Sequence, residues 1–312
     1  MFVPGRVCLL GEHCDWAGGS SLVAPLPLGI RPTFTPGGEG LRVSSDGHSA
    51  RYTLPPAPLR GGDPLRYVAA VAAELIARDR PPPPGALRLV SDLPQGRGFS
   101  SSAALCVAAV RALAPGLSPT EEADVAYVAE RERVGVACGR LDPIACAWGA
   151  VLALRWGPAL AVERVRAPPP PMAVAAFAEP RDTPGILAAL SEGHGGGRGE
   201  GIAARVRAAI ARWGALAIHG AAALERGELT ALGRQLDEAQ ATYEDLVPHL
   251  PELAAPGLVD AARMLRSEGA LGAKFSGAGG DGSVIALGRD RAHAGALAAR
   301  LEARGLAAWV IG

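Results

Sequence analysis

The sequence predicts an α+β protein of two domains. Its 312 residues exceed the length of a typical single domain, and 49% of them are hydrophobic, which is enough to build two cores. Short apolar runs typical of strands are mixed along the chain with longer runs of helical periodicity. The proline run at 168–171 interrupts this pattern and marks the expected boundary. We therefore expect an N-terminal domain over 1–167 and a C-terminal domain over 172–312.

Strands and glycine turns dominate the first ninety or so residues. Residues 2–10, FVPGRVCLL, form an apolar run typical of a strand, and the polar turn GEHCDWAGG follows it. Over 22–54, proline and glycine turns separate further expected strands, and 67–77 has the pattern of a helix. After the proline run at 81–84, a strand is expected over 87–90. This strand leads into a segment rich in glycine and serine.

That segment, PQGRGFSSSAA at 94–104, has the composition of a phosphate-binding loop. Gly96 and Gly98 allow the backbone to approach a bulky anion, and the serines at 100–102 can cap the apolar helix expected over 103–113. A helix N-terminus has unpaired N–H groups and a partial positive charge, so it favours a phosphate. A loop and a capped core helix without a ligand also explain this segment when it is taken alone.

The remainder of the first domain contains two acidic residues on expected helices. A helix is expected over 120–134, with Glu130 near its end. A small apolar helix is expected to begin at Pro143, directly after Asp142, because proline favours the first turn of a helix. The run 151–156 is then expected to form a strand.

The second domain is expected to open with a strand over 172–178. The segment 193–201, GHGGGRGEG, is too rich in glycine for a core element and predicts a mobile loop. Three helices follow, the third over 257–265, and a further helix near 291–304 precedes the strand 307–311. The first two of the three helices carry apolar stripes that predict core packing: Val206, Ile210, Trp213 and Ala217, then Leu229, Leu232, Leu236, Ala239, Tyr243 and Leu246.

Charge and cysteine content exclude several classes of function. The 31 basic residues balance the 31 acidic ones, so we expect neither a nucleic-acid surface nor an anionic membrane surface. The five cysteines have neither metal-ligand spacing nor the density of a disulfide scaffold, and reduced thiols in a cytoplasmic protein are expected. We expect no signal peptide, and no apolar run reaches the roughly 20 residues that a membrane-spanning helix needs. The expected partners are small molecules or other protein chains.

Three ionisable side chains, Glu12, His13 and Asp15, lie together in the turn after the first strand. Capping of the turn would explain them structurally. The functional alternative is that the carboxylates bind the hydroxyls of a polar substrate, since a carboxylate accepts two well-directed hydrogen bonds.

Three motifs in this order resemble the small-molecule kinases named after galactokinase, homoserine kinase, mevalonate kinase and phosphomevalonate kinase, the GHMP kinases. They are PGRVCLLGEHCDWAGG at 4–19, LPQGRGFSSSAA at 93–104 and GAKFSGAGGDG at 272–282. The segment 129–142 also resembles galactokinases, and 232–246 resembles a helix of the mevalonate kinase group. The resemblance implies an α+β fold of two domains with the active site in the cleft between them, the second domain being ferredoxin-like.

By this resemblance the protein uses ATP and Mg²⁺ to phosphorylate an alcohol. Ser101 and Glu130 would hold Mg²⁺, which takes oxygen ligands. Asp142 would be the base that accepts the proton of the acceptor hydroxyl, and Arg6 would stabilise the base and the transferred group. The implied ATP-binding residues are Pro94, Gly96, Arg97, Gly98, Phe99, Ser100, Ser101, Ser102, Ala103, Gly277, Ala278 and Gly279.

The implied acceptor is a monosaccharide in contact with Glu12, His13, Asp15 and Gly139. Trp16 stands where galactokinases usually have tyrosine, and Pro143 stands where they have glutamine. The last motif is closer to those of mevalonate or heptose kinases.

Two alternatives to a sugar kinase remain open. A mevalonate-type kinase would act on an alcohol that bears a carboxylate, which the carboxylates of Glu12 and Asp15 would repel. A catalytically silent sensor would bind ATP and a ligand without turnover. A sensor has no need of all four of Arg6, Ser101, Glu130 and Asp142, and this argues against it.

Overall fold

The structure, a computed structural model, describes residues 1–45, 47–56, 63–177 and 182–312. The chain divides into two compact units. Unit 1 consists of Met1–Arg6, Pro25–Gln95 and Ser100–Gly149, and unit 2 of Val7–Ala24, Gly96–Phe99 and Ala150–Gly312. Two segments from the N-terminal half of the chain are thus part of unit 2. The division into domains over 1–167 and 172–312 stays a prediction.

The strands of unit 1 are hydrogen-bonded in the order β4-β3-β5-β2. Strand β3 (Leu41–Ser45) forms an antiparallel hairpin with β4 (His48–Tyr52) and pairs in parallel with β5 (Gly85–Ser91). Strand β5 pairs antiparallel with the end of β2 (Gly19–Pro36). The strands expected over 22–54 and 87–90 are confirmed. Alternate side chains along β3 and β5 are buried, namely Leu41, Val43, Leu87 and Leu89.

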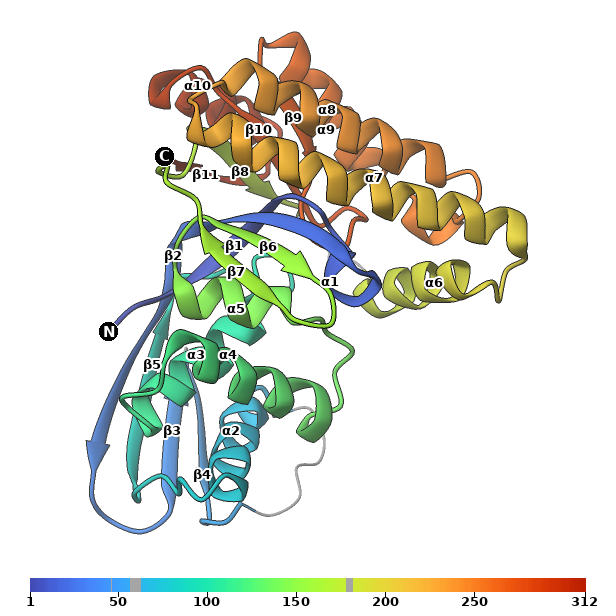
Figure 1. The fold of residues 1–312 in the computed structure, drawn as a ribbon. Coiled ribbons are helices and arrows are strands. Elements are labelled where there is room, and N and C mark those ends of the chain that lie inside the picture. Colours follow the sequence, from blue (N-terminus) through green and yellow to red (C-terminus); the bar gives the residue numbers. More distant parts are fainter. Residues whose placement is uncertain (46, 57–62, 178–181) are drawn as a thin grey trace. The chain divides into compact units, whose positions relative to one another are not determined.

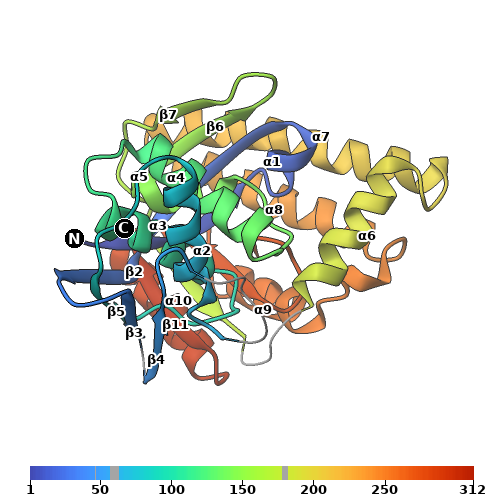
Figure 2. The ribbon, with the colours of Figure 1, turned by 90° about the horizontal axis from the view of Figure 1, so that it is seen from below.

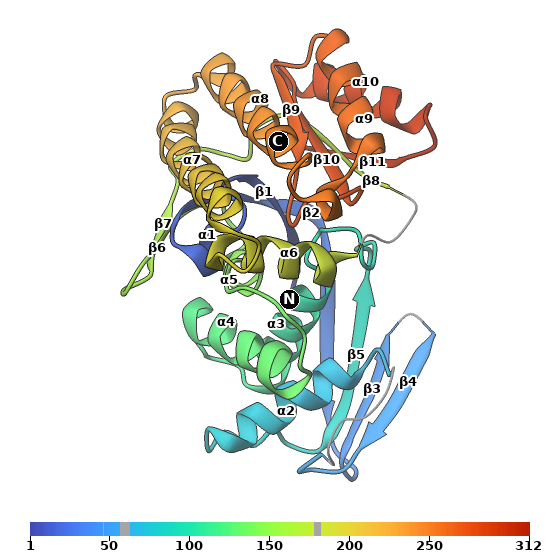
Figure 3. The ribbon, with the colours of Figure 1, turned by 90° about the vertical axis from the view of Figure 1, so that its right-hand side faces the viewer.

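Four helices pack together in unit 1 (Figure 3). They are α2 (Arg66–Ala77), α3 (Ser101–Leu113), α4 (Pro119–Val128) and α5 (Leu141–Trp148). Helix α3 is nearly all apolar and buried, as expected, and it contacts the other three.

Two expected boundaries in this region are wrong. The helix expected over 120–134 ends at Val128 and continues as the π-helical turn η1 (Ala129–Arg133). The wider π turn buries Glu130 while the charged residues after it stay exposed. Helix α5 begins at Leu141 and not at Pro143, because the first turn of a helix tolerates a residue without an N–H at any of its positions.

The second sheet lies wholly in unit 2 and is antiparallel, in the order β11-β8-β10-β9. It consists of β8 (Met172–Ala176), β9 (Gly272–Phe275), β10 (Ser283–Leu287) and β11 (Ala307–Ile311). Numbered along the chain, this order is 4-1-3-2, with helices after the first and third strands, which is the ferredoxin-like arrangement. The predicted ferredoxin-like domain is confirmed. The strand expected over 172–178 ends at Ala176, and Ala178 lies outside the described residues.

Two helices, α9 (Pro256–Ser267) and α10 (Arg291–Glu302), cover one face of this sheet (Figure 1). The core beneath them is built mainly from small side chains, which allow the helices to lie close to the strands. Its members include Ala173, Ala175, Ala261, Leu265, Ala273, Val284, Ala286, Leu297 and Leu301.

Three further helices connect β8 to α9. Helix α7 (Glu200–Glu225) lies beside α8 (Leu229–Leu246), and α6 (Thr183–Gly195) packs against α7 (Figure 2). The predicted apolar stripes are buried, apart from the half-buried Leu229.

The loop expected over 193–201 is wrong in its bounds, because only 196–199 lie outside the helices. Its first three residues end α6, and α7 begins at Glu200. Gly193 is buried, and a Cβ there would lie 3.0 Å from the side chain of Val206, so this glycine permits close packing of α6 on α7. Glycine content alone therefore mispredicted a helix–helix contact as a loop.

The remaining elements belong mostly to unit 2. Strand β1 (Val3–Leu10) is followed by the short helix α1 (Cys14–Ala17). Strand β6 (Leu152–Trp156) pairs with the beginning of β2 and with β7 (Ala161–Arg164), and η2 (Pro251–Leu253) is a 3₁₀ turn before α9. Within the described part of the chain, every helix is too short or too polar to cross a membrane.

We expect Gly220→Ala to destabilise the protein by about 1–3 kcal/mol, because overpacking a filled core costs this much. Gly220 lies in α7, where an added Cβ would come within 2.4 Å of Leu10 Cδ1, and Leu10 is fully buried. Gly295→Ala in α10 is the matched control, since nothing lies within 4 Å of its added Cβ. That variant should gain about 0.5–1 kcal/mol. Urea unfolding measures both, and equal stability of the two variants would contradict the close contact.

Candidate active site

Arg6 and Asp142 form an ion pair within unit 1. Nε and Nη2 of Arg6 donate hydrogen bonds to Oδ1 of Asp142 at 2.8 and 2.5 Å. The arginine side chain is 5% exposed and the aspartate side chain is 33% exposed. Both of these bonds end on Oδ1 and not on Oδ2. A general base needs an oxygen that lies within reach of the proton it accepts.

The position of Asp142 in α5 argues against a purely structural role. A helix-capping aspartate occupies the N-cap position and accepts a backbone N–H with its side chain. The N-cap residue of α5 is Arg140, and no side-chain capping bond is present there. Asp142 lies in the first turn, where the N-terminal partial charge of the helix also favours a carboxylate.

Glu130 is a buried carboxylate on the π-helical turn η1. It is 3% exposed and accepts a hydrogen bond from the hydroxyl of Ser102. Burial raises the pKa of Glu130 to about 7, and the negative charge of Asp142 adds to this increase. The serine that contacts Glu130 is thus Ser102, one residue after the predicted metal ligand Ser101.

The donor set around Glu130 fits a magnesium ion. The described residues include no group of three or more His, Cys, Asp or Glu side chains that could hold a metal by themselves. Mg²⁺ is commonly bound by one or two carboxylates, with phosphates and water as the other ligands. A cation beside Glu130 would stabilise the charged carboxylate, which burial otherwise disfavours.

The serine loop has a backbone that few residue types adopt. Gly96 and Gly98 have φ of 69° and 84°, and Ser100 has φ of 60°, in the left-handed region that disfavours side chains. Ser100 is the N-cap residue of α3 but makes no side-chain capping bond, so the expected capping by this serine is absent. Its Oγ is buried without a hydrogen-bond partner among the described residues. A buried hydroxyl without a partner at a helix N-terminus is consistent with a site that an anion completes.

Two side chains of this loop are anchored within unit 2. Arg97 donates a 2.6 Å hydrogen bond from Nη1 to the carbonyl oxygen of Phe177. Phe99 is buried, with its ring 5.6 Å from that of Trp309. These contacts fix the middle of the loop. Of the other predicted residues in this part of the chain, Pro94 and Gly139 are half-buried and Ala103 is buried in α3.

The predicted acceptor residues lie around α1. His13 is buried and has φ of 65°, and its ring lies 6.0 Å from that of Trp16 and 5.8 Å from that of Trp213. Asp15 is half-buried in α1. Trp16 is 37% exposed and stacks edge-on against His194. An aromatic surface beside a carboxylate is typical of small-molecule pockets.

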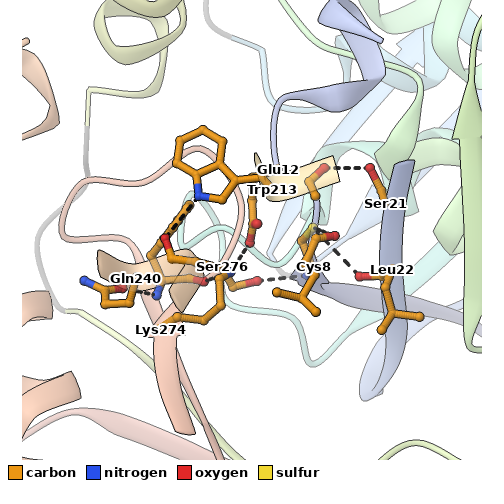
Figure 4. Close-up of polar contacts among 12 residues, drawn as sticks. Cys8, Glu12, Ser21, Leu22, Trp213, Gln240, Lys274 and Ser276 are labelled. Atoms are coloured by element: carbon orange, nitrogen blue, oxygen red, sulfur yellow. Dashed lines mark hydrogen bonds and ion pairs between the residues drawn. The ribbon is translucent and has the colours of Figure 1, made fainter. Parts of the chain in front are cut away.

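Glu12 makes a contact that the sequence did not reveal. Its carboxylate forms an ion pair with Lys274 of β9, and both side chains are at most 1% exposed (Figure 4). Burial raises the pKa of Glu12, and the charge of Lys274 opposes this increase. The sequence signal for this contact was the lysine within the motif GAKFSG. The residues around it are apolar or small, and a lysine that is buried among such residues needs a charged or polar partner.

The third glycine motif follows β9 and is fixed by Tyr243 of α8. Gly277 and Gly279 have φ of 82° and 92°. A Cβ on Gly279 would lie 2.6 Å from the Tyr243 ring, and the Tyr243 hydroxyl accepts a 2.8 Å hydrogen bond from the N–H of Gly280. Ala278, between these glycines, is half-buried. The motif is therefore a rigid turn packed on a helix.

Family models identify two domains and a signature along the chain. The model of the GHMP kinase N-terminal domain matches residues 66–150, and that of the GHMP kinase C-terminal domain matches 221–307. The galactokinase galactose-binding signature matches residues 1–34. This signature contains Arg6 and the acidic turn after β1.

Two relatives show where sequence similarity lies. A galactokinase of Mycobacterium bovis is 37% identical over 155 residues, which cover 47% of this chain and 42% of that protein. The match thus spans less than half the length of such relatives. A mevalonate kinase of Aeropyrum pernix is 29% identical over 291 residues, covering 91% of this chain and 86% of that protein.

The solved structure of Lactococcus lactis galactokinase complexed with galactose superimposes with a TM-score of 0.82. The two chains are 19% identical, and the superposition covers 99% of this chain and 92% of the other. This confirms the predicted fold. The signature, the N-terminal domain and the C-terminal domain follow one another along this chain, and the chain has the family's fold. The protein therefore belongs to the GHMP kinases.

Proposed function

We propose that the protein is an ATP-dependent kinase that transfers the γ-phosphoryl group to a hydroxyl of a monosaccharide or a sugar-like polyol. The observation that carries this proposal is the Arg6–Asp142 pair in a chain of the GHMP kinase family. Asp142 has its Oδ1 bound to a buried guanidinium. The galactokinase relatives and the galactose-binding signature support a sugar as acceptor.

In the proposed mechanism, Asp142 accepts the proton of the acceptor hydroxyl through Oδ2 as the oxygen attacks the γ-phosphorus. The buried Arg6 orients the carboxylate and stabilises negative charge near the reacting atoms. The serine loop would bind phosphate oxygens through backbone N–H groups at the start of α3. Ser101 and Glu130 would hold Mg²⁺, which neutralises charge on the phosphates when it is bound. ADP then leaves with the bridging oxygen.

The test of this proposal is ADP release from Mg·ATP with a panel of D-galactose, other neutral monosaccharides, uronic acids and mevalonate. We expect turnover with at least one neutral monosaccharide. Mevalonate belongs in the panel because the Aeropyrum pernix relative matches nearly the whole chain. Turnover of mevalonate alone would replace the sugar kinase by a mevalonate-type kinase. Binding of ATP without turnover of any acceptor would indicate a sensor.

Asp142→Asn should lower turnover by about 10²- to 10⁴-fold, because it preserves the shape of the side chain and removes the base. Binding of Mg·ATP should persist, as measured by isothermal titration calorimetry. Asp124→Asn is the matched control: Asp124 also pairs with an arginine of unit 1, Arg78 at 2.8 Å, but has no proposed role in the reaction. Near-normal turnover of Asp142→Asn would remove Asp142 from the mechanism.

Ser101→Ala should raise the Mg²⁺ concentration that gives half-maximal activity, because an oxygen ligand is lost. Ser118→Ala is the control for a helix-capping serine, since Ser118 forms a true capping box with Glu121 at the start of α4. It should lose about 1 kcal/mol of stability at unchanged Mg²⁺ dependence. If Ser101→Ala behaves like Ser118→Ala, then Ser101 is structural. If Ser102→Ala alone shifts the Mg²⁺ dependence, the ligand is the serine that contacts Glu130.

A further inference from the structure

Lys274 is the only lysine among the 31 basic residues of the chain, and it is fully buried. It lies in β9, where Ala273 faces the core beneath α9 and α10. Successive side chains of a strand point to opposite faces, so Lys274 lies on the other face of the sheet. There its Nζ donates to Glu12 (Figure 4). It also donates to the carbonyl oxygen of Phe275 and lies 4.1 Å from the centre of the Phe275 ring.

Burial of an ammonium group is unfavourable unless the group is paired and hydrogen-bonded. An apolar side chain of similar volume would fill the same space without this cost. Packing alone therefore does not explain why a charged pair lies here. Every other residue among the 31 basic ones is arginine. Lysine differs from arginine because its ammonium group is a compact point charge, whereas a guanidinium group can form two parallel hydrogen bonds.

The pair leaves one oxygen of Glu12 unused. Lys274 donates to Oε1, whereas Oε2 is buried and has no hydrogen-bond partner among the described residues. A buried carboxylate oxygen without a donor carries a desolvation cost that a hydrogen bond would offset. A hydroxyl of a bound substrate is a donor that could supply this hydrogen bond.

The surroundings of Lys274 hold it in place within unit 2. Phe275 donates its N–H to Oε1 of Gln240 at 2.9 Å, and Ser276 Oγ accepts the N–H of Cys8 at 2.9 Å. Strand β9 is thus joined to α8, and the residue after it is joined to β1. Glu12 lies two residues after the end of β1, in the turn that carries His13 and Asp15. A cation on such a rigid strand can fix the position of the carboxylate in that turn.

We propose that Lys274 is a positioning residue for the acceptor: its ammonium group holds Glu12 as a carboxylate whose Oε2 accepts a hydrogen bond from an acceptor hydroxyl. This inference rests on the proposed sugar kinase function. It also changes the charge of the acceptor turn, because the charge of Lys274 offsets that of Glu12.

The kinetic test is a double-mutant cycle of Lys274→Met and Glu12→Gln, with the monosaccharide that the wild type phosphorylates. Each single variant should raise the acceptor KM by about ten- to a hundredfold, the worth of a hydrogen bond to a charged group. The KM of Mg·ATP should change by less than about twofold. The double variant should be no worse than Glu12→Gln alone, because Lys274 acts through Glu12.

Arg266→Met is the matched control. Arg266 is also a cation attached to β9, since it donates to the carbonyl oxygen of Ala273 at 3.0 Å and to Asp237 at 2.6 Å. Its loss should lower the melting temperature and leave the acceptor KM unchanged. If Lys274→Met shows this same pattern, or if the effects of Lys274→Met and Glu12→Gln add, the positioning role is wrong.

A second measurement on the wild type covers the case in which Lys274→Met fails to fold. Lysine labelled with ¹³C at Cε gives a single lysine signal in this chain, which reports on Lys274 without further assignment. We expect this signal to shift saturably with the phosphorylated monosaccharide, and to lose that response in Glu12→Gln. A sugar that is turned over without moving the signal would overturn the inference and leave the kinase function intact. If no sugar is turned over, the proposed function fails first, and the inference fails with it.

Discussion

Burial of the Lys274 ammonium group is the constraint on which unit 2 depends most. The group is fully shielded from water, so its hydrogen bonds to Glu12 and to the Phe275 carbonyl must be present whenever the chain is folded. Removal of one partner of a buried pair typically costs about 3–5 kcal/mol. The turn after β1 and strand β9 are separated by more than half of the sequence, and the pair joins them.

Three carboxylates with proposed roles have three different surroundings. Asp142 is partly exposed and bound to Arg6. Glu130 is buried, and this burial raises its pKa to about 7. Glu12 is buried against Lys274, which opposes the effect of burial. The same functional group can thus serve as base, cation ligand and substrate contact.

The sequence predicts the fold well where periodicity is strong. The apolar stripes of α7 and α8 and the buried α3 are as expected. The ferredoxin-like sheet is also as expected, but that expectation came from the resemblance of the motifs to the family and not from periodicity. Short or glycine-rich elements were missed, among them α6 and the strand β7. In α6 the glycine serves close packing against Val206, a tertiary effect that local composition does not contain.

The candidate site could be predicted only in part, because its contacts are not local. The motif around Arg6 and the residue Asp142 are visible in the sequence, and their ion pair spans 136 positions. The contact of Glu12 with Lys274 spans 262 positions, and no local pattern connects them. The π turn that buries Glu130 was also hidden, because it has the same composition as an ordinary exposed helix end.

The burial of Lys274 has a consequence for the chemistry of the protein surface. The chain has no second lysine, so the folded surface offers no lysine amine to acylating reagents, aldehyde cross-linkers or enzymes that modify lysine side chains. Its positive surface charge comes from guanidinium groups, which remain protonated across the pH range of ordinary buffers. Covalent modification of this lysine would therefore report that the chain has opened.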